Sequence, residues 1–289
     1  MRIDSLEVSV FSRALADLRM NDEATRFYGR ISRGESFAPG QTIPVKVAME
    51  GFTAEGVRVG GVWTHNNLKI RSGLSIFRAD NLYSGGLDGA FETTAGNEFE
   101  LNAAVDYQYH RDILLRRPDV EPANGTGVAA DFYLEYRAHP ELALELSVED
   151  IGAQIRWREA PFSVATANTE RRPTGSSGFS GLKPTIEGVE GYRERYTQRL
   201  SARYRTVVEL GDGPVRLRAE AAYQFSDTFA GIGLKLLNDD TRSATVTYFP
   251  KFKTLALGYR QNRWFVTLAA DSLDEQKMRA ITTSFGYGY

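Results

Sequence analysis

Apolar and polar residues alternate along most of this chain of 289 residues, and this period of two constrains the fold more than any other feature. From Phe99 to Tyr109 the odd positions are aromatic or aliphatic, and the even positions are polar or small. The stretch from Val215 to Phe225 repeats the pattern. Successive side chains of a β-strand point to opposite faces of a sheet, so the alternation predicts strands with one apolar and one polar face.

About fourteen such segments occur between Ile43 and Tyr289, which predicts an all-β chain. Many run for about ten residues or more, which is longer than most strands of soluble proteins and matches the 9–11 residues of a tilted strand that crosses a bilayer. No stretch approaches the roughly 18 consecutive apolar residues of a transmembrane helix. The expected strands are 43–51, 56–64, 68–78, 82–92, 97–109, 126–138, 141–158, 195–210, 214–226, 228–237, 241–249, 253–261, 263–272 and 278–289.

The chain ends on the sequence AITTSFGYGY, in which alternate residues are apolar or aromatic. This pattern resembles the last strand of Gram-negative outer-membrane β-barrels, which commonly ends in an aromatic residue; Thr283 departs from it mildly. The resemblance implies a transmembrane antiparallel up-and-down β-barrel of about 14 strands, within a range of 12 to 16. It also implies that the barrel assembly machinery recognises an assembly signal made of Ile281, Phe285, Tyr287 and Tyr289.

Charged residues occupy the polar positions of the expected strands, and their sign changes along the chain. A charge that faces lipid at mid-depth costs about 2–4 kcal/mol, so these side chains are expected to line the lumen. The acidic set is Glu100, Asp106, Asp131, Glu135, Glu145 and Glu149, and the basic set is Arg199, Arg203, Arg205, Arg216, Arg218 and Arg260. Two readings stay open: an acidic wall facing a basic wall across a water-filled pore, or pairs that neutralise each other across a narrow lumen.

The first forty residues differ from the rest. Leu6, Val8 and Val10 alternate briefly, the stretch SRALADLRMND predicts a short helix, and Gly34 to Gln41 reads as a linker. We therefore expect residues 1–40 to form an N-terminal segment and residues 41–289 the barrel. The segment is either a plug or periplasmic element, or two further strands.

Two long gaps, 111–125 and 159–194, follow the fifth and seventh expected strands, both odd in number. Because barrels place their long loops on one side of the membrane, both gaps are expected to be loops on the same side. The phase change at Glu149, Asp150 and Ile151 predicts a β-bulge, or a strand end followed by a short extension.

Composition excludes several kinds of chemistry. The absence of cysteine removes disulfides, thiolate metal sites and cysteine nucleophiles, and a net charge of −2 argues against a nucleic-acid partner. The histidines at 65, 110 and 139 belong to no catalytic motif, and no metal-ligand spacing or phosphate loop is present. We expect no enzyme activity, no cofactor and no metal.

These features favour an outer-membrane channel that passes small polar solutes, anions among them. The first alternative is the barrel anchor or exit duct of a secretion or polysaccharide-export system, and the second is a soluble β-sandwich binding protein. Expected partners are outer-membrane lipid and lipopolysaccharide, the barrel assembly machinery, and a polar solute or an exported polymer. Because the sequence shows no signal peptide, a mature outer-membrane form is expected.

Overall fold

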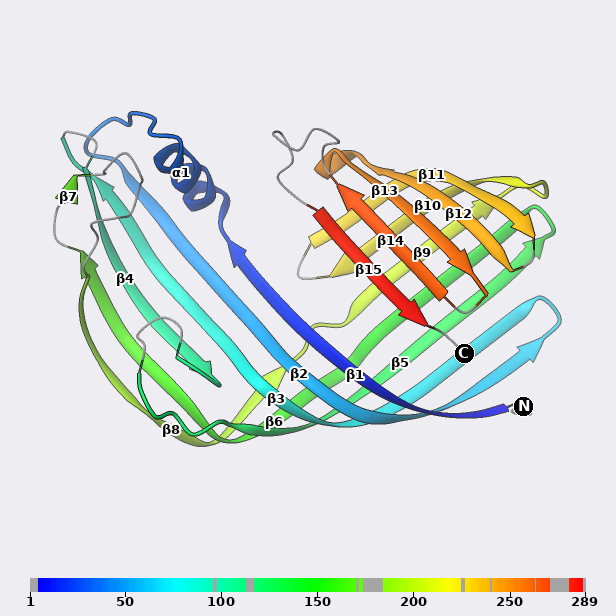
Figure 1. Cartoon of the computed structure of the whole chain (residues 1–289), viewed down its shortest axis with the longest axis horizontal. Coiled ribbons are helices and arrows are strands. Elements are labelled where there is room, and N and C mark those ends of the chain that lie inside the picture. Colours follow the sequence, from blue (N-terminus) through cyan, green and yellow to red (C-terminus); the bar gives the residue numbers. More distant parts are fainter. Residues whose placement is uncertain are drawn as a thin grey trace.

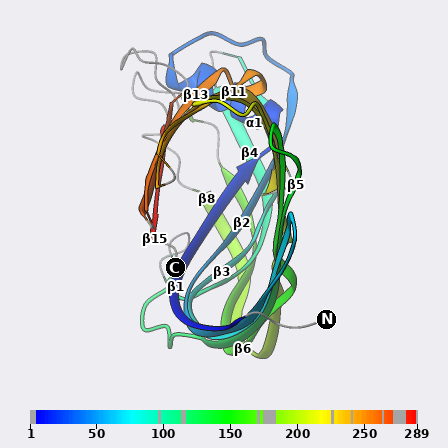
Figure 2. The same ribbon diagram turned by 90° about the vertical axis from the view of Figure 1, so that its right-hand side faces the viewer.

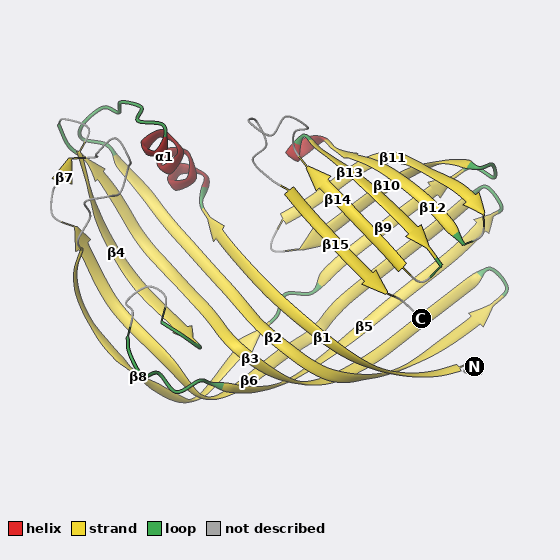
Figure 3. Cartoon of the chain, in the orientation of Figure 1, coloured by secondary structure: helices red, strands yellow, loops and turns green. Residues whose placement is uncertain are grey.

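The computed structural model describes residues 5–95, 98–112, 117–169, 172–173, 184–224, 227–239, 241–262, 264–270 and 281–287. Within these ranges nearly every element is a strand, and all strands belong to one antiparallel sheet (Figures 1 and 3). The elements are β1 Ser5–Met20, α1 Asp22–Ser32, β2 Thr42–His65, β3 Leu68–Thr93, β4 Glu98–Tyr109, β5 Asn124–His139, β6 Leu142–Thr169, β7 Arg172–Pro173, β8 Pro184–Arg199, β9 Arg203–Leu210, β10 Val215–Gln224, β11 Asp227–Asp239, β12 Arg242–Phe249, the 3-10 helix η1 Pro250–Phe252, β13 Thr254–Gln261, β14 Trp264–Ala270 and β15 Ile281–Tyr287.

The sheet follows the path β1-β2-β3-β4-β6-β9-β10-β11-β12-β13-β14-β15 from one edge to the other. Strands β4 and β5 lie end to end between β3 and β6, and β8 and β9 lie end to end beside β6. The sheet is strongly curved, and both views place β15 on the side of the molecule where β1, the other edge strand, lies (Figures 1 and 2). The prediction of an all-β antiparallel fold is therefore confirmed.

Three strands are much longer than the sequence pattern predicted. β2 has 24 residues, β3 has 26 and β6 has 28. At about 3.3 Å per residue, β3 is roughly 85 Å long. Four expected strands are in fact two, since 43–51 and 56–64 are both in β2, and 68–78 and 82–92 are both in β3. At the expected break the β2–β3 ladder only shifts its register, between Gly51 and Thr53, so the strands bend instead of turning.

The prediction for the gap at 111–125 was also wrong. β4 and β5 both run antiparallel to β3, so the segment between them joins two strands of the same direction and does not reverse the chain. It therefore leaves the sheet halfway along β3 and does not form a loop at the end of a hairpin. By contrast, the predicted bulge near Asp150 is confirmed: the β5–β6 register shifts on both sides of Ala130, and Asp150 has a φ of 62°.

Residues 5–40, the described part of the N-terminal segment, form one strand and one helix. β1 pairs along its whole length with β2, from Ser5 opposite Val62 to Met20 opposite Val47. The helix expected over Ser12–Asp22 is thus wrong, because the ladder with β2 outweighs the helix propensity of alanine, leucine and arginine. The helix α1 begins only at Asp22.

Helix α1 packs on the sheet near Val45 of β2, Phe91 of β3 and Phe99 of β4, and Figure 1 shows the helix beside the curved sheet. Its buried residues, Ala24, Phe27 and Ile31, share one side of the helix. The ring centroid of Phe27 lies 5.2 Å from that of Phe91 and 5.7 Å from that of Phe99. This aromatic cluster, completed by Phe37 and Val45, fixes the helix against the sheet.

Replacing Phe27 by alanine should release α1. Phe27 is 2% exposed, and removing a buried phenylalanine costs about 3–5 kcal/mol. We expect faster proteolysis within Asp22–Ser32, measured by mass spectrometry of limited digests, and unchanged protection of β9–β14. Tyr28→Ala is the matched control, because Tyr28 is 49% exposed and should be tolerated. Equal protection of α1 in the Phe27→Ala variant and the wild type would contradict this packing.

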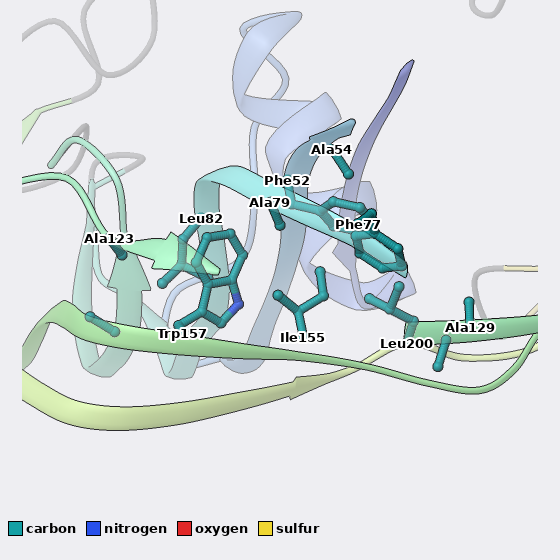
Figure 4. Packing of buried hydrophobic residues seen from close by; sticks show 12 residues of the cluster. Phe52, Ala54, Phe77, Ala79, Leu82, Ala123, Ala129, Ile155, Trp157 and Leu200 are labelled. Atoms are coloured by element: carbon teal, nitrogen blue, oxygen red, sulfur yellow. The ribbon is translucent and has the colours of Figure 1, made fainter. Parts of the chain in front are cut away.

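A larger apolar core fills the bend of the sheet (Figure 4). Trp157 and Ile155 of β6 pack there with Phe52 of β2 and with Phe77 and Leu82 of β3. The Trp157 indole donates a hydrogen bond of 3.1 Å to Oε1 of Gln198 in β8, which satisfies its buried N–H. The core holds the long strands together at the level where β4, β5, β8 and β9 begin or end.

Candidate functional site

Directly paired residues of an antiparallel ladder point to the same face, so the register extends each face across the sheet. Val10 is opposite Val57, Val57 is opposite Ile76, and Ile76 is opposite Val128. We call the side that carries these residues the apolar face. Its large side chains that lie exposed on β1–β3, β5 and β9–β14 include Leu6, Val8, Val10, Val57, Val59, Leu74, Ile76, Val128, Tyr204, Leu210, Val215, Leu217, Tyr223, Ile232, Leu234, Leu236, Tyr248, Leu257, Tyr259, Trp264, Val266 and Leu268.

The apolar face is continuous over the short strands. One row runs from Leu217 through Leu234, Val246 and Leu257 to Leu268. Aromatic residues border the face on both sides, with Tyr204, Tyr223 and Tyr248 near one margin and Tyr259 and Trp264 near the other. From Tyr223 to Val215 this face spans nine residues of β10. A tilted strand that crosses a bilayer needs about 9–11 residues, and aromatic girdles border the apolar band of transmembrane barrels.

The opposite side of the sheet, which we call the charged face, carries ionised side chains held in networks. In the first network Glu209 of β9, 3% exposed, accepts hydrogen bonds of 2.8 Å from Arg218 and 2.9 Å from Lys235. Arg218 also contacts Glu220 at 2.9 Å, and Arg205 contacts Glu220 at 2.9 Å. Every buried charge of this group therefore has an opposite charge within hydrogen-bonding distance.

A second network crosses the concave side of the sheet. Asp150, 2% exposed, accepts two hydrogen bonds from Arg13 of β1, at 2.6 and 2.8 Å, and one of 3.1 Å from Arg203 of β9. Arg203 also pairs with Glu149 at 2.6 Å. Three strand positions separate β1 from β6, so this contact requires the sheet to curve around the charged face. A hollow of about 420 Å³ lies here, and Arg58, Arg71 and Asp131 are among its lining residues.

Small side chains occupy part of the charged face of β11–β14. They lie at successive register positions and include Gly233, Thr247 and Ala256, with Thr245, Gly258, Thr267 and Ala269 beside them. The same face of these strands also carries larger side chains, namely Phe229, Phe249, Phe265, Lys235 and Arg260.

The structure brings the two predicted sets of pore residues together and places three of their members elsewhere. Arg203 contacts Glu149, one residue from each set, and Arg205 and Arg218 pair with glutamates of their own neighbourhood. The register puts Asp131, Glu135, Glu145, Arg216 and Arg260 on the charged face as well. Arg203, Arg205 and Arg218 therefore pair with nearby glutamates and do not form a separate basic wall.

Glu100, Asp106 and Arg199 lie away from this lining. Glu100 and Asp106 belong to β4 in the long extension of the sheet, where Asp106 pairs with Arg193 at 3.3 Å. Arg199 is opposite Gln154, which is opposite Val128, so it lies in a row of the apolar face. Strict alternation along 195–210 would have placed Arg199 on the same face as Arg203 and Arg205. The bulge near Asp150 and the break between β8 and β9 shift the alternation, so Arg199 lies on the opposite face.

Sequence reasoning missed several members of the networks, namely Arg13, Asp150, Glu209, Glu220 and Lys235. Glu209 and Glu220 share the alternating phase of Arg205 and Arg218, so the same period-two count could have found them. Arg13 could not be found because its segment was predicted to be helical. Tyr107 and Tyr109, at the end of the alternating stretch that begins at Phe99, are completely buried, and the hydroxyl groups of Tyr109 and Ser163 share a hydrogen bond of 3.0 Å.

The C-terminal strand β15 pairs antiparallel with β14 along its whole length. Phe285 is opposite Val266, and Tyr287 is opposite Trp264. Tyr289 lies outside the described residues, so the predicted assembly signal, Ile281, Phe285, Tyr287 and Tyr289, stays a prediction.

The chain is therefore an all-β protein whose single large antiparallel sheet separates an apolar from a charged face. Residues 62–288 match the model of a family of unknown function, DUF5723, and the chain belongs to that family. No curated protein and no solved structure matches it. Among the described residues, no helix combines the length and the apolar character needed to cross a membrane.

Proposed function

We propose that the chain forms an outer-membrane β-barrel that acts as a channel for small polar solutes. The observation that carries this proposal is the apolar face: it is continuous across the short strands, largely exposed, and bordered by aromatic residues. Burying this surface in lipid removes it from water at no cost in backbone hydrogen bonds, because the sheet already satisfies them. A soluble β-sandwich would need a second sheet over this face, and the described residues form one sheet only.

Pairing of β1 with β15 would close the barrel. These strands are the two edges of the sheet, and the curvature of the sheet brings them to the same side of the molecule (Figure 2). Closure would make a barrel twelve strands wide, which is even, as bacterial single-chain barrels require. It would also remove two exposed edges that are otherwise liable to aggregation.

The charged face would then line the lumen. Its ion pairs neutralise most of the buried charge, and small side chains such as Thr247, Ala256 and Gly258 occupy part of the opposite strands. Arg216 departs from this neutrality, because its buried Nε has no hydrogen-bond partner among the described residues and it is opposite Lys235. Two cations in direct register favour an anionic solute in this part of the lumen.

Exchanging Arg216 for glutamate tests this lumen. In planar bilayers the wild type should conduct and favour anions, and Arg216→Glu should lower the anion-to-cation permeability ratio several-fold, because it reverses a charge in the proposed lumen. Arg78→Glu is the control, because it makes the same charge change on the other side of the sheet, at a side chain 72% exposed. Selectivity that stays the same in Arg216→Glu, or a wild type that inserts without conducting, would contradict the channel.

A second candidate is supported by the long strands. A transmembrane strand needs about 9–11 residues, and β2, β3 and β6 have more than twice that number. Their far halves, with α1 and β8, would form a wall outside the membrane on which an exported polymer or a secretion partner could be held. In that case the barrel is an anchor or exit duct, and it should insert into bilayers without steady conductance.

A further inference from the structure

An unusual group of arginines lies where the apolar face ends. The row Val57, Ile76 and Val128 continues into Gln154 and Arg199. Two residues further along the strands, Arg156 stands between Thr126 and Thr197; two further again, Arg158 stands between Asn124 and Arg195. We call Arg156, Arg158 and Arg195 the arginine site, and Arg199 lies beside it. The arginine site adjoins the last apolar row on the same face of the sheet.

The arrangement within the arginine site is unfavourable without a counter-ion. Arg158 is directly opposite Arg195, and side chains in such pairs have Cβ atoms about 4.5–5.5 Å apart, where like charges repel. On the neighbouring strands β2 and β3, in the row that leads to Arg156, opposite charges face each other instead: Glu55 is opposite Arg78. No ion pair joins Arg156, Arg158 or Arg199 to a carboxylate within the described part of the chain. Arg195 has only a 4.0 Å contact with the adjacent Glu194.

The surface at the arginine site is hollowed and lined with donors. The hollow measures about 1180 Å³, and its lining includes Thr126, Gln154, Arg156, Arg158 and Arg195. Two carboxylates, Glu159 and Glu194, border it on the side away from Val128. Guanidinium groups, hydroxyls and an amide in one hollow suit a phosphate group, because arginine binds phosphate oxygens through two parallel hydrogen bonds.

We propose that the arginine site binds the phosphate of an anionic membrane lipid whose acyl chains lie on Val57, Ile76 and Val128. The inference rests on the proposed membrane location of the apolar face. A lipid fits better than a free phosphate, since the hollow opens directly onto exposed apolar side chains that only an acyl chain would cover. The bound phosphate would offset the repulsion between Arg158 and Arg195.

The test is native mass spectrometry of the full chain in detergent micelles, titrated with dioleoyl phosphatidylglycerol or dioleoyl phosphatidylcholine. The wild type should retain phosphatidylglycerol with a preference of about ten-fold, as one charge-assisted contact of about 1.4 kcal/mol gives. Arg158→Gln plus Arg195→Gln should reduce the preference to about one, within the same estimate. The control variant is Arg137→Gln plus Arg242→Gln. Arg137 lies near the end of β5 away from the arginine site, and Arg242 is the first residue of β12, so this variant should retain the preference for phosphatidylglycerol.

The outcomes separate this site from the proposed function. Equal binding of both lipids by the wild type, or an unchanged preference in the Arg158 and Arg195 variant, would overturn the arginine site and leave the barrel intact. Binding of neither lipid, by a chain that stays monodisperse without detergent, would overturn the membrane location itself. Soluble glycerol 3-phosphate at the same concentration should not displace phosphatidylglycerol; displacement would mean that the site binds a free phosphate and not a lipid.

Discussion

Replacing Leu217 by arginine should prevent the chain from assembling in membranes. Leu217 is 60% exposed and lies on the apolar face of β10, between Leu210 and Leu234. An arginine that faces lipid costs up to about 2–4 kcal/mol, depending on its depth, which is a large part of the stability of a small domain. We expect the heat-resistant folded band on cold gel electrophoresis to be lost or strongly reduced after refolding into lipid vesicles.

The same substitution distinguishes lipid from water as the medium around this face. In a water-soluble protein an arginine at so exposed a position would change stability by less than about 0.5 kcal/mol. The control is Asp212→Arg, in the exposed turn between β9 and β10, which should refold like the wild type. Wild-type yields of folded Leu217→Arg in vesicles would contradict the proposed membrane location.

Replacing Glu209 by glutamine should also have a large effect, through the opposite face. Glu209 neutralises Arg218 and Lys235, and Arg218 is only 9% exposed. Removing one partner of a buried ion pair leaves an uncompensated charge and costs about 3–5 kcal/mol. The midpoint of urea unfolding in vesicles should fall accordingly.

A compensated variant keeps this prediction specific. Glu209→Gln combined with Arg218→Gln and Lys235→Gln removes the stranded cations, so a large part of the lost stability should return. Glu141→Gln, at an exposed residue of the β5–β6 turn, should cost nothing measurable. If Glu209→Gln unfolds at the wild-type midpoint, the network does not hold the sheet together.

The strands that alternation predicted best are β10 to β14. They match the expected segments closely, because each strand has one apolar face and pairs with a single strand on either side along its length. Alternation failed at the long strands, where the chain bends at Gly51 and Asn81 without turning back. A local pattern break looks the same whether the strand bends or ends, and only the pairing partner decides which occurs.

The candidate site could be predicted in part for the same reason. Period two assigned Arg205, Arg216 and Arg218 to a polar face, because they lie on regular strands. It could not show that Glu209 neutralises Arg218, since that depends on the register between β9 and β10. Nor could it show that Arg13 reaches Asp150, which requires the curvature of the whole sheet.

Collision accessibility of spin labels along β10 tests the central claim most directly. The chain has no cysteine, so single cysteines at positions 215 to 219 can be labelled one at a time and reconstituted in lipid vesicles. Labels at the odd positions should be accessible to oxygen dissolved in lipid, and labels at the even positions to a water-soluble nickel complex. Odd positions that are as open to the nickel complex as even ones would show that water, and not hydrocarbon, covers the apolar face.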